Sequence, residues 1–284
     1  MIKNAKGLIA LDIDGTITTD MRPIPSYVVQ YLTELNQQGW LFVFITGRTF
    51  DFGFSVLKEL PFSYFYAVQN GAILLSMPNR IILNKKYLNV SVIPPMAKIC
   101  QNAPTDFVIY AGYEFNNQCF YRKNHFSDEL LKYLAERCKA YGEEWVSIES
   151  FDQLPMKEFP SMKCFGKLEQ AQYVAQAIEN ELALHVPIIK DPFSNEYYVV
   201  QATHSEVSKG YALKDLVTRL GYQGNIIAAG DDLNDISMFD EAHIKIAMEN
   251  APEELKARAT IIAPPASLAG IVEGLKQAIR GLDQ

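Results

Sequence analysis

Long apolar runs are absent from this sequence of 284 residues. No stretch approaches the roughly 18 apolar residues that a membrane-spanning helix needs, so we expect no membrane segment. A basic stripe is missing too, and the formal net charge is −7. Because nucleic-acid-binding domains concentrate Lys and Arg on one face, nucleic acid is excluded as an expected partner. An acidic protein that handles an anion needs a few local cations or a bound metal at its site.

Cysteine and histidine are scarce, with four of each. The cysteines, at positions 100, 119, 138 and 164, lack the CxxC spacing of a zinc site, and no histidine cluster accompanies them. A short apolar run near the start ends in two aspartates, so it predicts a strand rather than a signal peptide. We therefore expect a cytoplasmic protein with reduced, mostly buried thiols rather than disulfides.

The apolar residues that are present, 49% of the chain, predict a globular protein with a substantial core. Continuous apolar runs at 7–13, 40–48 and 64–74 are typical of buried strands. Helical spacing of apolar residues occupies 26–38 and 50–60. The order strand, helix, strand, helix, strand indicates right-handed crossovers and a parallel sheet.

The pattern changes after about Asn84 and returns from about Ser208. Residues 107–123 predict two strands around an Asn-Asn turn, and an amphipathic helix follows with Ser127 as its N-cap. We therefore predict an α/β fold, a Rossmann-like parallel-sheet core with an inserted α+β domain. The predicted domains are core residues 1–84, insert residues 85–201 and core residues 202–284.

Acidic residues follow two of the predicted core strands. Asp12 and Asp14 come at the end of the first strand, and their carboxylates are expected to converge where open α/β sheets bind ligands. Three more acids lie in segment 230–235 (GDDLND), after another apolar run. Such acids repel one another unless a cation joins them, and oxygen ligands suit Mg²⁺. The alternatives are solvated turns or a calcium loop, although the twelve-residue EF-hand pattern is incomplete.

Groups suited to holding phosphate occur elsewhere in the core. Thr46 can give a hydroxyl to a phosphoryl oxygen, and the neighbouring Gly47 amide can approach an oxygen closely. Lys209 opens a predicted helix directly after the insert. Taken singly, these residues are as well explained by an ordinary turn and a surface charge.

Together and in this order, the segments resemble the motifs of the haloacid dehalogenase (HAD) superfamily. Its four motifs match Asp12–Thr16, Thr46, Lys209 and Gly230–Asp235, and the resemblance covers about 165 residues of core. Only about 30 residues separate Asp14 from Thr46, whereas about 160 separate Thr46 from Lys209. The cap must therefore lie between the second and third motifs, which is similar to the Cof-type branch with an α+β cap, subfamily IIB.

This resemblance implies an Mg²⁺-dependent phosphatase that hydrolyses small phosphate monoesters, such as sugar phosphates, through an aspartyl phosphate. It implies that Asp12 is the nucleophile and that Asp14 is the general acid and then the base. The implied ligands of Mg²⁺ are the Asp12 carboxylate, the Asp14 main-chain carbonyl and Asp231. The implied substrate-binding residues are Thr46, Gly47, Lys209 and Asn234. The roles of Asp232 and Asp235 stay open.

Two rival functions stay open at this point, a sugar phosphomutase of the same superfamily and a non-catalytic metabolite-binding homologue. The phosphorylated substrate, the cap residues that select it and the oligomeric state are not readable from the sequence.

Overall fold

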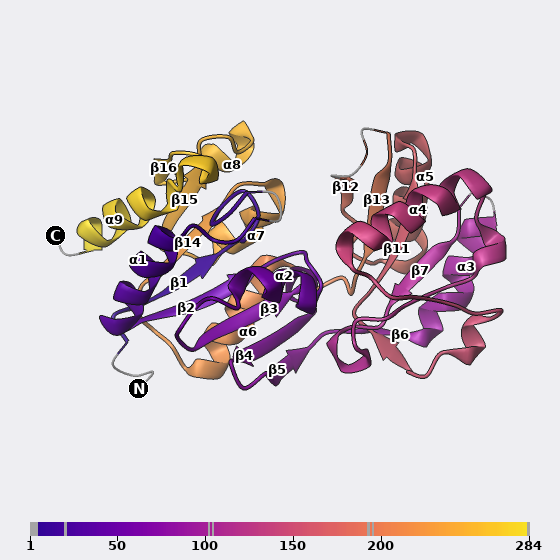
Figure 1. Cartoon of the computed structure of the whole chain (residues 1–284), viewed down its shortest axis with the longest axis horizontal. Helices are drawn as coiled ribbons and strands as arrows, with labels where there is room; N and C mark the ends of the chain where they lie inside the picture. The colour runs from indigo at the N-terminus through magenta and orange to yellow at the C-terminus, as the bar shows by residue number, and fades with distance from the viewer. Residues whose placement is uncertain are drawn as a thin grey trace. The chain divides into compact units, whose positions relative to one another are not determined.

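The computed structural model describes residues 5–19, 22–101, 103, 105–191, 194 and 196–282. Its contacts divide the chain into two compact units. The core unit comprises Met1–Arg48, Gly53–Lys85 and Ser208–Gln284, and the insert unit comprises Thr49–Phe52 and Lys86–Val207. Figure 1 follows the chain through both units.

An eight-stranded sheet organises the core unit, in the order β16-β15-β14-β1-β2-β3-β4-β5. The strands from β16 to β3 are parallel, and β4 and β5 are antiparallel to their neighbours. The predicted α/β fold with a parallel-sheet core is confirmed. The strands are β1 (Gly7–Leu11), β2 (Trp40–Ile45), β3 (Tyr64–Val68), β4 (Ile73–Met77), β5 (Ile81–Lys85), β14 (Ile226–Gly230), β15 (Ile244–Met248) and β16 (Ile261–Ala263).

One predicted strand is wrong in extent. Residues 64–74 form two antiparallel strands, β3 and β4, joined by a single 3-10 turn at Gln69–Gly71. Gln69 and Asn70 have φ values of 51° and 57°, and Gly71 has a φ of 99°. A Cβ on Gly71 would lie 2.7 Å from the Cβ of Ala212. The left-handed backbone and this close approach explain why the chain reverses here instead of continuing.

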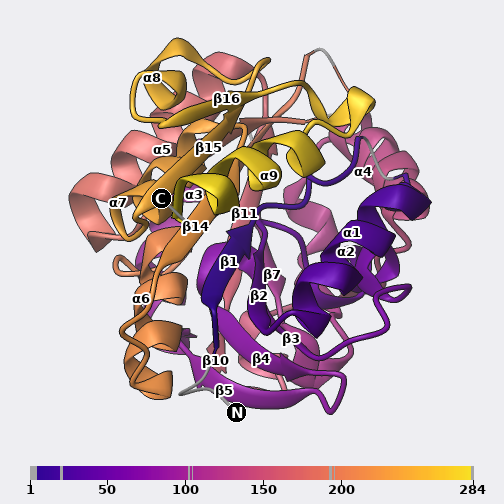
Figure 2. The same cartoon turned by 90° about the vertical axis from the view of Figure 1, so that its left-hand side faces the viewer.

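Helices cover both faces of the core sheet. Alternate strand residues such as Leu8 and Val43 pack with Leu213 and Phe239 on the face that carries α6, α7 and α8. On the other face, α9 packs closely enough that a Cβ on Gly274 would lie 2.8 Å from the Cγ2 of Ile246. Figure 2 shows α1 and α9 together on that face. The core-unit helices are α1 (Ser26–Gln37), α2 (Phe50–Leu57, which spans the unit boundary), α6 (Lys209–Leu220), α7 (Ile236–Asp240), α8 (Glu253–Lys256) and α9 (Ile271–Leu282).

The insert unit is built on a six-stranded sheet in the order β12-β13-β11-β7-β8-β9, with a separate β10-β6 pair. Helices α3 and α5 pack on one face, where Ile99, Ile109 and Val174 are buried together. Helix α4 packs on the other, where Leu134 lies against Phe165. The elements are β6 (Leu88–Asn89), α3 (Ile93–Gln101), β7 (Phe107–Tyr110), β8 (Cys119–Tyr121), α4 (Asp128–Tyr141), β9 (Trp145–Ser147), β10 (Glu158–Phe159), β11 (Ser161–Gly166), α5 (Leu168–Leu182), β12 (Ile188–Lys190) and β13 (Tyr198–Ala202).

The predicted Asn-Asn turn and the predicted N-cap of α4 are confirmed in the insert unit. Asn116 and Asn117 both have positive φ in the turn between β7 and β8. The Ser127 side chain accepts a hydrogen bond from the Leu130 amide and so caps α4. All four cysteines are free, and three of them are buried.

Among the described residues, no helix is long and apolar enough to span a membrane.

Candidate active site

The site begins where β1 ends. β1 lies between β2 and β14 in the parallel part of the sheet, so the residues after all three strands emerge at the same edge. Asp12 follows β1 directly, and its backbone N–H donates to the Ala229 carbonyl at 3.0 Å. Only 5% of Asp12 is exposed. A buried carboxylate at this position requires a cationic partner.

Lys209 supplies that partner from the start of α6. The Ser208 side chain caps the helix by accepting from the Tyr211 amide. This cap fixes the backbone at Lys209, whose Nζ lies 2.7 Å from Asp12 Oδ1 and 2.7 Å from Asp235 Oδ1. Burial works against the ammonium, but the two carboxylates outweigh it and raise the pKa of Lys209. The lysine therefore stays charged, and it links Asp12 in the first motif to Asp235 in the fourth.

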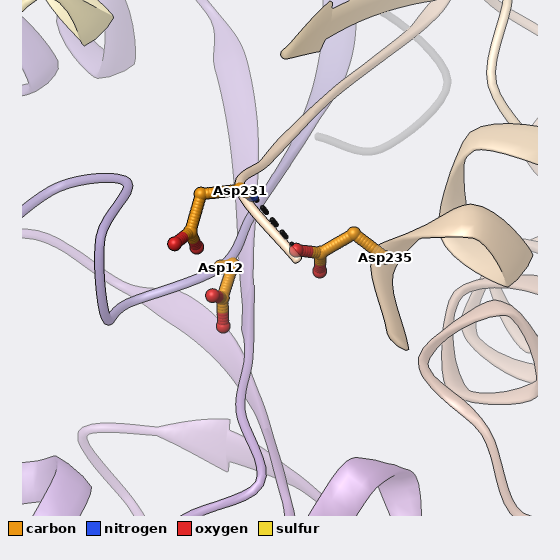
Figure 3. A group of neighbouring side chains, drawn as sticks. All are labelled: Asp12, Asp231 and Asp235. Carbon is orange, nitrogen blue, oxygen red and sulfur yellow. Dashed lines mark hydrogen bonds between the residues drawn. The ribbon is translucent and has the colours of Figure 1, made fainter. Parts of the chain in front are cut away.

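Asp12, Asp231 and Asp235 form an acidic cluster, drawn in Figure 3, and each offers one oxygen within 4.8 Å of the others. Asp235 is fully buried, and its Oδ2 accepts from the amides of Asp231 at 2.9 Å and Asp232 at 3.1 Å. With Lys209 on its other oxygen, Asp235 braces the loop after β14. The exposed Asp232 accepts from the neighbouring Leu233 amide and forms a capping box with Asp235, so it acts locally in the turn.

The acidic cluster carries more negative charge than Lys209 can balance. Burial raises the pKa of Asp12 well above its ordinary value, and the nearby acids Asp235 and Asp231 add to this effect while Lys209 opposes it. Burial, followed by the charge of Asp235, raises the pKa of Asp231 to about 7. Both directions indicate a site that gains from an additional cation.

Asp14 is directed elsewhere by its surroundings. The strand ends at Leu11, so the two-residue spacing no longer sets both carboxylates side by side on a strand. Arg48 holds the Asp14 carboxylate by two hydrogen bonds, one of them from Nε to Oδ2 at 2.7 Å. The Asp14 side chain remains 47% exposed, whereas that of Arg48 is 6% exposed. Sequence reasoning assigned no role to Arg48, although it follows Thr46 and Gly47 directly.

Gly15 shapes the turn that follows Asp14. Its φ of +68° is a backbone conformation that side chains rarely adopt, and a Cβ there would overlap the Asp231 carboxylate. The neighbouring Thr16 hydroxyl donates to Asp231 Oδ1 at 3.3 Å. Sequence reasoning missed this contact. The turn thus leaves the Asp231 carboxylate room that any side chain at position 15 would occupy.

The loop after β2 presents the polar groups predicted to hold phosphate. Thr46 is 1% exposed, and its backbone N–H donates to the Ala67 carbonyl. Its hydroxyl oxygen accepts from the Arg48 amide at 3.1 Å, which leaves the hydroxyl hydrogen for another oxygen. A Cβ on Gly47 would lie 3.3 Å from Asn70 Oδ1. Asn234 donates to the same Asn70 oxygen at 3.4 Å, so Asn70, which sequence reasoning left without a role, connects two loops of the site.

These residues fit a hard divalent cation. Asp12, Asp231 and Asp235 offer carboxylate oxygens in one small region, and burial, with the charge of the neighbouring acids, raises the pKa of the first two. Oxygen donors of this kind suit Mg²⁺. Asp14 lies outside this group of carboxylates because Arg48 engages its side chain.

Comparisons with known proteins identify the family. A family described as haloacid dehalogenase-like hydrolase matches residues 9–275. The pyridoxal phosphate phosphatase YbhA of Escherichia coli is 24% identical over 273 residues, which is 90% of this chain and 92% of that protein.

Solved structures share the fold. A haloacid dehalogenase-like hydrolase from Bacteroides thetaiotaomicron superposes with a TM-score of 0.77 at 19% identity, covering 95% of this chain and 98% of its own. A HAD subclass IIB sugar phosphatase, BT4131, gives a TM-score of 0.72 at 22% identity with the same coverage.

The resemblance to the Cof-type branch is confirmed by these findings, and so is the predicted enzyme class, a phosphoric monoester hydrolase. The family match runs through both parts of the core unit and through the insert between them. The chain as a whole therefore belongs to the haloacid dehalogenase-like hydrolase family.

Proposed function

We propose that this protein is an Mg²⁺-dependent phosphatase that hydrolyses small phosphate monoesters through a phosphorylated Asp12. The observation that carries the proposal is the position of the Asp12 carboxylate, 2.7 Å from the ammonium of Lys209 and beside the carboxylates of Asp231 and Asp235. Asp12 is also the first residue after β1, at the sheet edge where ligands of α/β proteins bind.

In the first step, an Asp12 oxygen attacks phosphorus and the bond to the leaving-group oxygen breaks. Carboxylates act as covalent nucleophiles in other phosphoryl transfers. Lys209 and the Thr46 hydroxyl hold the phosphoryl oxygens, the Gly47 amide donates to one of them, and Asn234 supports the phosphate from the neighbouring loop. These donors stabilise the charge that spreads over the equatorial oxygens in the transition state.

Asp14 moves the proton in both steps. It protonates the leaving oxygen, then removes a proton from the water that hydrolyses the acyl phosphate. Arg48 orients the Asp14 carboxylate, and the half-exposed side chain of Asp14 is free to exchange this partner for substrate. General acid help contributes about 10²–10⁴-fold, so Asp14 alone does not explain a phosphatase rate.

Mg²⁺ would be held by the Asp12 carboxylate, the Asp14 main-chain carbonyl and Asp231, with Asp235 bracing the loop. When bound, the ion offsets the charge of the carboxylates and of the phosphoryl group. The demand is large, because hydrolysis of a monoester requires up to about 10²¹-fold acceleration, or nearly 29 kcal/mol at about 1.36 kcal/mol per decade. Nucleophile, cation, lysine and positioning must therefore act together.

We infer a small phosphorylated metabolite, with sugar phosphates first, as the substrate. The names of two similar proteins support this class, since one is a pyridoxal phosphate phosphatase and the other a sugar phosphatase. We further propose that the protein works in the reducing cytoplasm, in agreement with its four free cysteines.

A phosphate-release screen over about a hundred phosphorylated metabolites, with Mg²⁺ or with EDTA, tests the proposal. We expect release from at least one sugar phosphate or related monoester with Mg²⁺ and none with EDTA. Asp12→Asn should abolish turnover while keeping its circular dichroism spectrum. Asp240→Asn, at a 57% exposed side chain outside the site, is the matched control and should keep full activity.

The outcomes separate the rivals. Substantial turnover by Asp12→Asn would refute the nucleophile assignment. Isomerisation of a sugar phosphate without phosphate release would identify a phosphomutase. Inactivity of the wild type towards every monoester would favour the non-catalytic metabolite-binding homologue.

A further inference from the structure

One face of the insert sheet divides into an apolar part and a polar part. α4 covers the apolar part, where Val108, Phe165 and Val199 are buried. Lys163 lies on β11, two residues before Phe165, and pairs with Gln201 on β13. Because alternate strand residues share a face, Lys163 and Gln201 point to the same side as these apolar residues, and Thr203 continues the row.

Three polar side chains in this row are buried without a hydrogen-bond partner among the described residues. Gln201 and Thr203 are each 1% exposed, and neither Gln201 Nε2 nor Thr203 Oγ1 has a partner. Lys163 is 8% exposed, and no carboxylate oxygen in the described structure lies within 4.0 Å of its Nζ. Its Nζ lies over the ring of Tyr110, 4.2 Å from the ring centroid.

Another cation engages the nearby acids Asp191 and Glu143, although their charges still favour the ammonium of Lys163. Arg137 on α4 donates to Asp191 at 2.8 Å and to Glu143 at 2.8 Å. Tyr110 and Trp145 donate to Glu143 as well. Burial, followed by the charge of Arg137, lowers the pKa of Lys163 to about 8. Lys163 is thus kept in an environment that disfavours its own charge.

Such an arrangement does not serve stability. Lysine is almost never fully buried unless it is paired, and a buried donor left without a partner is destabilising. All three groups can donate hydrogen bonds, and the side-chain ammonium adds a positive charge. What they share is a need for oxygen acceptors, and the charge of the Lys163 ammonium favours acceptors that are negatively charged.

We propose that Lys163, Gln201 and Thr203 form a binding site for an oxyanion, the carboxylate or phosphate group of a small ligand, on the sheet of the insert unit. The site is additional to the Asp12 centre and does not depend on the phosphatase proposal. Lys163 supplies the charge, and the amide of Gln201 and the hydroxyl of Thr203 supply directed hydrogen bonds.

Titration calorimetry of the full chain tests this site, with malonate as the carboxylate probe and inorganic phosphate as the phosphate probe. We expect the wild type to bind at least one of them, and Lys163→Met to weaken that binding tenfold or more. Lys163→Arg keeps charge and donors and should retain most of it. Lys167→Met, at a 57% exposed lysine of the same unit, is the matched control and should bind as the wild type does.

Two further readouts keep the test independent of folding and of the Asp12 centre. Turnover of p-nitrophenyl phosphate should be equal in the wild type and Lys163→Met, so a failure of the phosphatase proposal is visible separately. Without anion, Lys163→Met should melt at a higher temperature than the wild type, because an unpaired buried charge is removed. Unchanged anion binding in Lys163→Met, or no binding of either probe by the wild type, overturns the proposal. So does a lower melting temperature of Lys163→Met, which would make Lys163 a structural partner of the Arg137 cluster.

Discussion

Replacing Lys209 by Met tests how the centre of the core unit is held together. The ammonium bridges Asp12 and Asp235 at 2.7 Å each, and the lysine is only 2% exposed. The Met side chain fills a similar volume but leaves both carboxylates without their cation. Breaking a buried ion pair by removing one partner destabilises a protein by about 3–5 kcal/mol. With about 2–4 °C per kcal/mol for a domain of this size, we expect the core unit to melt roughly 6–20 °C lower.

The two tryptophans make this measurement selective. Trp40 lies on β2 of the core unit and Trp145 on β9 of the insert unit. In a Trp145→Phe background, tryptophan fluorescence during thermal unfolding reports the core unit alone, which matters because the two units need not unfold together. The measurement is made without Mg²⁺, so that no bound ion offsets the missing charge.

A double variant provides the decisive comparison. Asp12→Asn removes one of the two carboxylates that Lys209→Met leaves uncompensated, so the double variant should regain about 1–3 kcal/mol over the sum of the single effects. Strict additivity of the two substitutions would refute the reasoning, because it would mean that the ion pair contributes nothing that depends on both partners.

Three other predictions concern single residues. Gly15→Ala should abolish Mg²⁺-dependent activity because its Cβ overlaps the Asp231 carboxylate; Gly142→Ala, at a similar φ of +65° with nothing within 4 Å, should lose only about 1–2 kcal/mol of stability and keep activity. Arg48→Met should lower kcat up to about 10²–10⁴-fold on alkyl monoesters and far less on p-nitrophenyl phosphate, whose leaving group needs little protonation; equal losses would exclude a role in orienting the general acid. The pKa of Lys163 is lowered from 10.5 to about 8, so burying its ammonium destabilises the folded protein fully below pH 8 and less as the pH rises to 10.5. In urea unfolding, the stability of the wild type relative to Lys163→Met should therefore rise by roughly 3 kcal/mol across that pH range.

The sequence was sufficient to predict the order of strands and helices in the core unit and the acids that follow β1 and β14. Apolar runs followed by acids predicted the ends of β1 and β14, because a buried parallel strand has few other sequence forms. The break between β3 and β4 was missed because apolar residues flank it on both sides. The Asn70-Gly71 pair inside it is a turn signal that, weighted more heavily, would have divided the run.

The ion-pair partner of each acid was harder to predict from the sequence than the place of that acid in the fold. Asp12 and Asp14 are two residues apart, yet one pairs with Lys209 and the other with Arg48. That division depends on where β1 ends and on the left-handed turn at Gly15, and neither is encoded in the spacing of the acids. The hydrogen bonds of Asp235 to two loop amides likewise arise only once the loop after β14 is formed.

The position of β1 between β2 and β14 has a consequence for synthesis of the chain. β2 ends at Ile45 and β14 begins at Ile226, so about 180 residues are translated between the two neighbours of the strand that carries Asp12. At ~5–20 residues per second, this interval lasts roughly 10–40 s. The ribosome thus completes residues 86–207 of the insert unit before β14 can pair with β1 in the core sheet. A nascent chain therefore carries Asp12 about 200 residues before it gains Lys209, and longer still before it gains Asp231 and Asp235.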